Sequence, residues 1–179
     1  MFTFAFLFIL TVCPITADKY VKLYNIVCET SSKWIENATC RLKVIGRNVV
    51  VANMEMDTKN PFRNISVHFQ VFKFYSQFRP YIINTAFNIC DILKKRAASN
   101  FYINTIIRIL SKFSNAIQCP LSGHIYAKNL EIKYEYLRLF VEERKYRLNF
   151  KFYEGLDTLA NVTMYAEIIN KYSRPTKKV

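Results

Sequence analysis

Several segments of the chain alternate apolar and polar residues with a period of two. In 146–152 the even-numbered residues are apolar, and in 65–71 the odd-numbered residues are apolar. This alternation is typical of an antiparallel strand that buries one face. Strands are predicted over 20–28, 39–44, 49–57, 65–71, 81–89, 124–134, 146–152 and 162–168. About eight such strands predict a mostly β domain built as a two-sheet antiparallel sandwich.

One region departs from this pattern. Between residues 91 and 115 the apolar residues follow the spacing of a helix. The apolar face consists of Ile103, Ile106, Ile107, Leu110 and Phe113. We expect an amphipathic helix over 101–113, preceded by a shorter helical turn over 91–97, with Ser99 or Asn100 as the cap of the second helix. The sandwich is therefore predicted to carry an inserted helical segment.

The amino terminus has the plan of a signal peptide. Residues 2–12 are almost purely apolar and are followed by Pro14 and the small-residue exit Thr16-Ala17. A run of this length is too short to cross roughly 30 Å of hydrocarbon. We expect cleavage after Ala17, which gives a signal peptide over 1–17, one domain over 18–170 and a basic flexible tail over 171–179. The protein is predicted to be secreted and extracellular.

The mature chain would keep an even number of cysteines, because Cys13 leaves with the signal peptide. In an oxidising compartment, an even number indicates disulfides rather than a zinc site, and the chain has no Cys-x2-Cys spacing. Three pairings are open. A hairpin over 22–47 would place Cys28 opposite Cys40, close enough for a bridge. Cys90 with Cys119 then follows by elimination.

Three Asn-x-Ser/Thr sequons, at Asn37, Asn64 and Asn161, fall on the polar face of the predicted strands. A glycan can be carried only where the side chain faces solvent. Three independent two-way choices agree by chance about once in eight. The agreement supports the strand assignments and the secretory route together, and it predicts three glycosylation sites.

The residues that catalysis or cofactor binding would need are sparse. Three glycines in the whole chain cannot supply a phosphate-binding loop. His68 and His124 stand alone on predicted strands, and Glu142-Glu143 is interpreted as a solvated turn. No catalytic motif accompanies them. We therefore expect no enzyme activity, no cofactor and no metal site. A hydrolase would require a buried, converging pair of these histidines with a carboxylate.

The chain is strongly basic, with a formal net charge of +13 and a pI of about 9.6. Basic clusters occur at 94–96, 144–147 and 174–178. Such charge favours acidic glycans, anionic membrane surfaces or an acidic receptor outside the cell, and it is equally typical of a solvated face. A secretory destination argues against nucleic acid as a partner.

A series of short motifs resembles a known family. They are Cys28, Cys40-Arg-Leu-Lys-Val44, Phe78-Arg-Pro-Tyr81, Asn84, Phe87-Asn-Ile-Cys90 and Cys119-Pro120, with the basic-apolar helix before the last. They are similar to an insect family of secreted proteins, a domain of unknown function related to the lipid-recognition (ML) β-sandwich superfamily, which includes the CheB chemosensory proteins. The resemblance spans residues 26–167. It implies an immunoglobulin-like β-sandwich whose interior holds a lipid or hydrophobic semiochemical.

These observations predict a non-catalytic carrier or presenter of a hydrophobic ligand. The interior would be rich in aromatic side chains, which make up 16% of the chain and can either fill a core or line a cavity. The candidate ligand-binding residues are Phe69, Val71, Phe87, Ile106, Leu110, Leu148, Phe150 and Met164. The alternative is an extracellular interaction module with a filled core, which would bind acidic glycans or a receptor through its basic surface.

Overall fold

The computed structural model describes residues 19–95, 101–137 and 141–171. The expected signal peptide, the expected helix cap at Ser99 or Asn100 and nearly all of the expected tail lie outside the described residues. The domain boundaries at residues 18 and 170 therefore stay a prediction.

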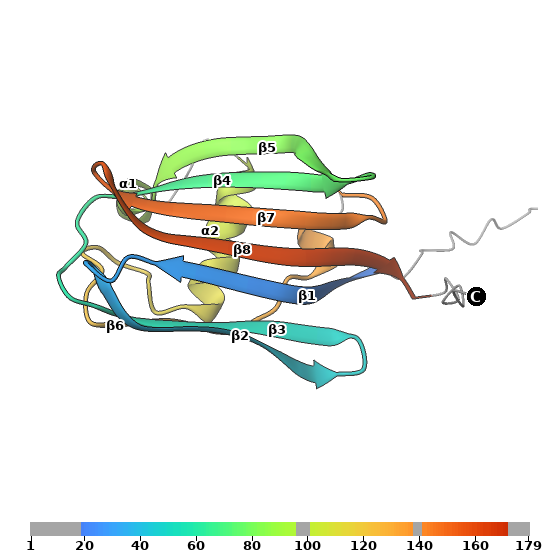
Figure 1. The fold of residues 1–179 in the computed structure, drawn as a ribbon, viewed down its shortest axis with the longest axis horizontal. Coiled ribbons are helices and arrows are strands. Elements are labelled where there is room, and N and C mark those ends of the chain that lie inside the picture. Colours follow the sequence, from blue (N-terminus) through green and yellow to red (C-terminus); the bar gives the residue numbers. More distant parts are fainter. Residues whose placement is uncertain (1–18, 96–100, 138–140, 172–179) are drawn as a thin grey trace, which may run out of the picture.

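The described chain folds into two antiparallel sheets that face one another (Figure 1). The larger sheet has the order β1 (Lys19–Thr30), β8 (Asp157–Asn170), β7 (Lys145–Glu154), β4 (Ile65–Phe74) and β5 (Phe78–Asn88). The smaller sheet has the order β2 (Ile35–Gly46), β3 (Val49–Thr58) and β6 (His124–Leu130). This confirms the predicted mostly β, immunoglobulin-like antiparallel sandwich of eight strands.

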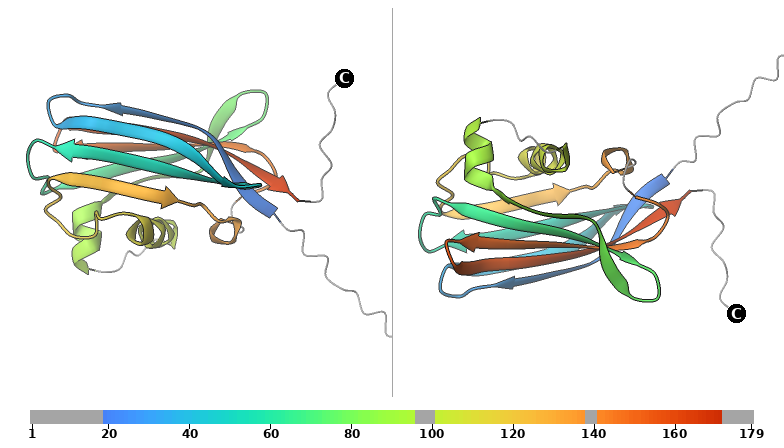
Figure 2. Two further views of the ribbon diagram at one scale, coloured as in Figure 1. Left: turned by 90° about the horizontal axis from the view of Figure 1, so that it is seen from below. Right: turned by 90° about the horizontal axis from the view of Figure 1, so that it is seen from above.

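The helices lie together on one side of the sandwich, next to β6 (Figure 2). They are α1 (Ile89–Lys95), α2 (Phe101–Phe113) and the 3-10 turn η1 (Tyr134–Tyr136). The bounds of α2 are those that the apolar spacing predicts. The predicted strand 124–134 is too long, because Asn129 takes a positive φ of 54° and the strand ends at Leu130.

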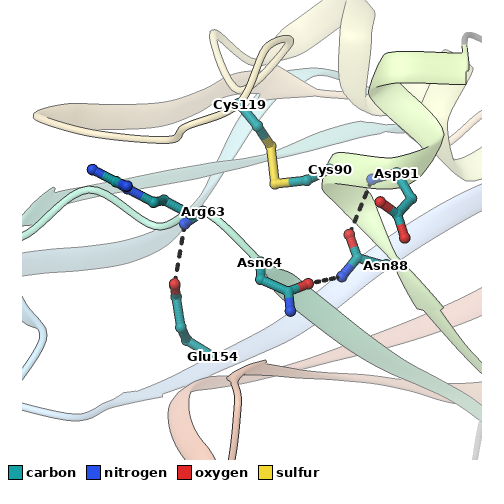
Figure 3. Close-up of a disulfide and its surroundings, with 7 residues drawn as sticks. All are labelled: Arg63, Asn64, Asn88, Cys90, Asp91, Cys119 and Glu154. Carbon is teal, nitrogen blue, oxygen red and sulfur yellow. Dashed lines mark hydrogen bonds between the residues drawn. A yellow bond between two sulfur atoms is a disulfide. The ribbon is translucent and has the colours of Figure 1, made fainter.

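A side-chain cap starts α1 two residues earlier than predicted. The Oδ1 of Asn88 accepts a hydrogen bond of 3.0 Å from the backbone N–H of Asp91 (Figure 3). This satisfies one of the N–H groups that a helix leaves unpaired at its start. The same Asn88 donates through Nδ2 to Oδ1 of Asn64, so the end of β5 is tied to the start of β4.

The predicted hairpin over 22–47 is wrong. Strand β1 pairs with β8 in the larger sheet, while β2 pairs with β3 in the smaller one. The chain changes sheets at a tight turn in which the N–H groups of Trp34 and Ile35 both donate to the carbonyl of Ser31. A continuous period-two pattern on both sides of a turn is compatible with a hairpin and with a corner between sheets, so the pattern alone could not distinguish them.

Both expected disulfides are present, but Cys28–Cys40 does not lie across a hairpin as predicted. Cys28 and Cys40, with Cα atoms 6.1 Å apart, join the two sheets instead of two paired strands. Cys90 and Cys119, with Cα atoms 5.6 Å apart, join the start of α1 to the segment before β6. The second bridge closes the loop that contains α1 and α2 at its base (Figure 3).

The inner faces of the two sheets form the core. Along β4 the odd-numbered residues from Ile65 to Val71 are buried, and along β8 the even-numbered residues from Val162 to Ile168 are buried. This is the parity that the sequence predicts. Asn37 and Asn64 are exposed, whereas Asn161 is half-buried and donates through Nδ2 to Glu29 at 2.9 Å.

Replacing both cysteines of one bridge by serine should lower the free energy of unfolding. The chain-entropy model gives about 3 kcal/mol for Cys28–Cys40 and roughly 3.5 kcal/mol for Cys90–Cys119, because the second bridge closes a longer loop. Urea unfolding of the two double-serine variants checks this order. A variant without Cys28 and Cys40 that is as stable as the wild type would show that the inter-sheet bridge is not needed to hold the sheets together.

A candidate ligand-binding cavity

An apolar cavity of about 140 Å³ lies between the larger sheet and α2. The strands β4, β7 and β8 supply one wall through their inward-facing residues, and α2 supplies another through Thr105, Ile106, Ile109 and Leu110. We call this space the α2 cavity. The period-two and helical patterns position its walls, because both direct apolar side chains into the same interior.

Seven of the eight residues predicted as ligand-binding line the α2 cavity. They are Phe69, Val71, Ile106, Leu110, Leu148, Phe150 and Met164. Phe87 does not line this cavity. It lies on β5, pairs with Val67 of β4, and packs against the core near the start of α1. Binding by any of these residues stays a prediction.

Sequence reasoning missed the part of the wall that comes from outside the regular elements. Tyr136, Leu137 and Val141 line the α2 cavity and lie in or beside η1. The apolar character of these side chains indicates burial. Their spacing has neither the period of a strand nor that of a helix, so it does not predict which space they face. Tyr81 of β5 lines the cavity as well.

A second apolar cavity of about 140 Å³ lies toward α1 and the Cys90–Cys119 bridge. Ile89 and Leu93 of α1 line it, together with Phe62 and Leu121, which exchange backbone hydrogen bonds of 2.8 and 2.9 Å. We call this space the α1 cavity. Its lining is almost wholly apolar, with Ser111 and Ser114 among the exceptions.

The two cavities share a wall. Met54, Leu110, Phe152 and Val162 line both of them. Met54 comes from the smaller sheet, Leu110 from α2, and Phe152 and Val162 from the larger sheet. Because methionine is an unbranched and adaptable side chain, this wall can rearrange more readily than one of β-branched residues. A long apolar molecule could occupy both cavities only by displacing these side chains.

Rigid aromatic packing holds the floor of the α2 cavity. The rings of Phe69 and Phe150, paired across β4 and β7, stack with centroids 4.5 Å apart. Offset stacking of this kind contributes about 0.5–1.5 kcal/mol beyond the buried area. The floor is therefore preformed, as expected of a small-molecule site.

Polar groups lie next to the apolar lining of the α2 cavity, beside Tyr146 and Val141. The Oη of Tyr146 accepts a hydrogen bond of 2.9 Å from the backbone N–H of Glu142, and burial raises the pKa of this tyrosine. The Nζ of Lys73 donates to Oε2 of Glu142 at 2.7 Å. This hydrogen bond raises the pKa of Lys73 and lowers the pKa of Glu142, so both groups are charged at neutral pH.

The two histidines lie in different sheets. His68 of β4 lies with Nε2 2.6 Å from Oδ1 of Asn84, and His124 of β6 lies with Nδ1 2.8 Å from Oδ1 of Asp57. Hydrogen bonds from Asn37 and then from His124 lower the pKa of Asp57. The converging histidine pair that a hydrolase would require is therefore not formed.

Within the described ranges of the chain, no group of three or more His, Cys, Asp or Glu side chains gathers in a way that could hold a metal ion. In the same residues, no helix combines the length and the apolar character needed to cross a bilayer.

Comparisons with known proteins give one family match and a remote structural likeness. Residues 67–148 match the model of a family described as "Protein of unknown function (DUF1091)". A solved structure, the crystal structure of a Niemann-Pick type C2 protein from Japanese carpenter ant, is 14% identical in sequence with a TM-score of 0.30. The alignment covers 82% of this chain and 90% of that one. No curated protein matches the chain.

If the α2 cavity is open space, enlarging a side chain that faces it should cost little. Ala166 is buried and lines this cavity, whereas the equally buried Ala52 lines neither cavity. Ala52→Leu should lose about 1–3 kcal/mol of unfolding free energy through overpacking. Ala166→Leu should lose less than about 1 kcal/mol or gain stability, because its added methyl groups are removed from water without strain.

Urea unfolding of the two leucine variants measures this difference. Equal losses for Ala166→Leu and Ala52→Leu would mean that the space beside Ala166 is already filled.

Proposed function

We propose that the protein is a secreted, non-catalytic carrier or presenter of a hydrophobic ligand. The observation that carries this proposal is the pair of apolar cavities between the sheets and the helices. An apolar cavity of roughly 150 Å³ stays dry and holds a molecule the size of benzene. Each cavity is of that size, so each can take a ring or a short stretch of alkyl chain.

The cavities also favour the carrier over the interaction module, the alternative that the sequence left open. A carrier needs apolar space that water does not occupy, whereas an interaction module needs only a surface and is served by a filled core. The interior is not filled. Contacts of the basic surface with acidic glycans, an anionic membrane or a receptor stay predictions beside the carrier proposal.

The ligand class extends to lipids and hydrophobic semiochemicals, and we include a chemosensory role in the proposal. Its support is the resemblance of the motifs around residues 78–90 and 119–120 to the insect family that includes the CheB proteins. The family match to residues 67–148 covers both of these motif groups.

Filling the α2 cavity with an indole should abolish ligand uptake. Ala166→Trp places the ring between β8 and α2, whereas Glu167→Trp places the same ring on the outer face of the same strand. We expect the wild type and Glu167→Trp to take up a fluorescent fatty acid saturably, with Ala166→Trp showing at least a tenfold loss. Titration by fluorescence, with circular dichroism to verify folding, measures this.

Native mass spectrometry of the protein from a secretory host gives an independent reading. We expect a co-purified lipid on the wild type and on Glu167→Trp. A wild-type protein that carries no lipid and shows no saturable uptake would refute the carrier function.

Secretion and glycosylation are also part of the proposal. The intact mass from a secretory host should correspond to a chain that starts at Asp18 and carries N-glycans at Asn37, Asn64 and Asn161. Asn64 faces solvent, and its Oδ1 accepts a hydrogen bond from Asn88 (Figure 3). Nδ2 of Asn161, in contrast, donates to Glu29. We therefore expect the highest occupancy at Asn64 and the lowest at Asn161.

Single Asn→Gln variants, each compared by mass before and after glycosidase treatment, assign the sites. A secreted protein that retains residues 1–17 would contradict the proposed cleavage, and an unchanged mass after glycosidase would contradict glycosylation.

A further inference from the structure

A buried lysine ends the inward-facing row of β4. The odd-numbered residues from Ile65 to Val71 point into the core, and Lys73 continues the row with 5% of its surface exposed. Among the described residues, Lys73 is the one charged residue that is buried. Burying an ammonium group is costly unless the charge is paired and hydrogen-bonded. Its position therefore needs an explanation beyond solubility.

Lys73 does not itself line the α2 cavity, but its side chain lies against residues that do. Its Nζ lies 5.0 Å from the centroid of the Tyr81 ring and 5.4 Å from that of the Tyr75 ring. Tyr81 lines the cavity, and so does Tyr146, which lies directly opposite Lys73 on β7. Two aromatic faces stabilise a cation at this point without neutralising it.

The ion pair of Lys73 with Glu142 is unequal. The side chain of Glu142 is 69% exposed, whereas that of Lys73 is almost completely covered. An exposed carboxylate can leave the pair and be hydrated at little cost, while the ammonium group would remain buried between tyrosine rings. A lysine also has three N–H donors, so it can bind a second carboxylate oxygen. Glu142 thus occupies a place that another carboxylate could take.

Val141 connects this ion pair to the cavity. It lines the α2 cavity and is the chain neighbour of Glu142, whose backbone N–H donates to the buried Tyr146 hydroxyl. A molecule with its apolar part between α2 and the larger sheet would therefore have its end beside the Lys73 ammonium group. The favourable end group at this point is an anion.

We propose that the ligand of the α2 cavity is an amphiphile with a carboxylate head group, such as a medium- or long-chain fatty acid, bound by Lys73. The carboxylate displaces Glu142 from the ammonium group, and the alkyl chain extends past Phe69 and Phe150 toward the α1 cavity. This inference rests on the proposed carrier function. It adds the chemical class of the ligand and the residue that selects it.

The test compares dodecanoic acid with 1-dodecanol, which have equal chain lengths and differ in head-group charge. Affinities at pH 8 are obtained by displacement of the neutral probe N-phenyl-1-naphthylamine. The wild type should bind the acid at least tenfold more tightly than the alcohol, the factor expected for one charge-assisted hydrogen bond. Lys73→Met should lose this preference while retaining the probe and the alcohol, and Lys73→Arg should keep the preference.

Glu142→Gln separates ligand binding from a purely structural ion pair. It removes the competing carboxylate, so the affinity for dodecanoic acid should increase severalfold while that for 1-dodecanol stays unchanged. A structural ion pair would give no such increase.

Equal binding of acid and alcohol by the wild type, or a preference for the acid that survives in Lys73→Met, would overturn the head-group assignment and leave the carrier function intact. A wild-type protein that binds neither the probe nor either ligand would overturn the carrier function as well.

Discussion

The unequal width of the two sheets is the constraint on which the rest of the structure depends. Five strands face three, so the smaller sheet cannot cover the inner face of the larger one. At the β1–β2 edge the disulfide Cys28–Cys40 holds the sheets together. On the other side α2 covers the exposed apolar face (Figure 2). The cavities lie beside α2, where the smaller sheet has no strand to pack against the larger one.

This arrangement determines how polarity is distributed in the interior. Both cavities are lined by apolar side chains over most of their surface, and the buried charged group, Lys73, lies outside this lining against Tyr81. The positive charge of Lys73 is stabilised by the exposed carboxylate of Glu142 and by two tyrosine rings. No buried carboxylate is its partner among these contacts. Such a site can exchange its anion without leaving a carboxylate unpaired in the core. The proposed carrier function and the proposed preference for a carboxylate thus depend on the same open side of the sandwich.

The sequence predicts most of this fold because the period of apolar residues reports directly on burial. The even-numbered residues of β8 and the apolar face of α2 point where the patterns place them. The apolar period does not report which strands pair. A turn such as Ser31–Trp34 can either close a hairpin or transfer the chain between sheets. Leu137 and Val141 lie outside the periodic segments, so the sequence pattern does not predict that they line the cavity. The sequence shows of Lys73 only that a basic residue lies on the inward-facing side of its strand.

We propose that the space beneath α2 holds a ligand and is not a loosely packed core. The most direct measurement is a crystal structure of the protein purified from a secretory host without added ligand. We predict continuous, elongated electron density between α2 and Phe150, with one end within hydrogen-bonding distance of Nζ of Lys73. Density limited to protein atoms, with α2 packed onto the larger sheet and the cavity closed, would contradict the account.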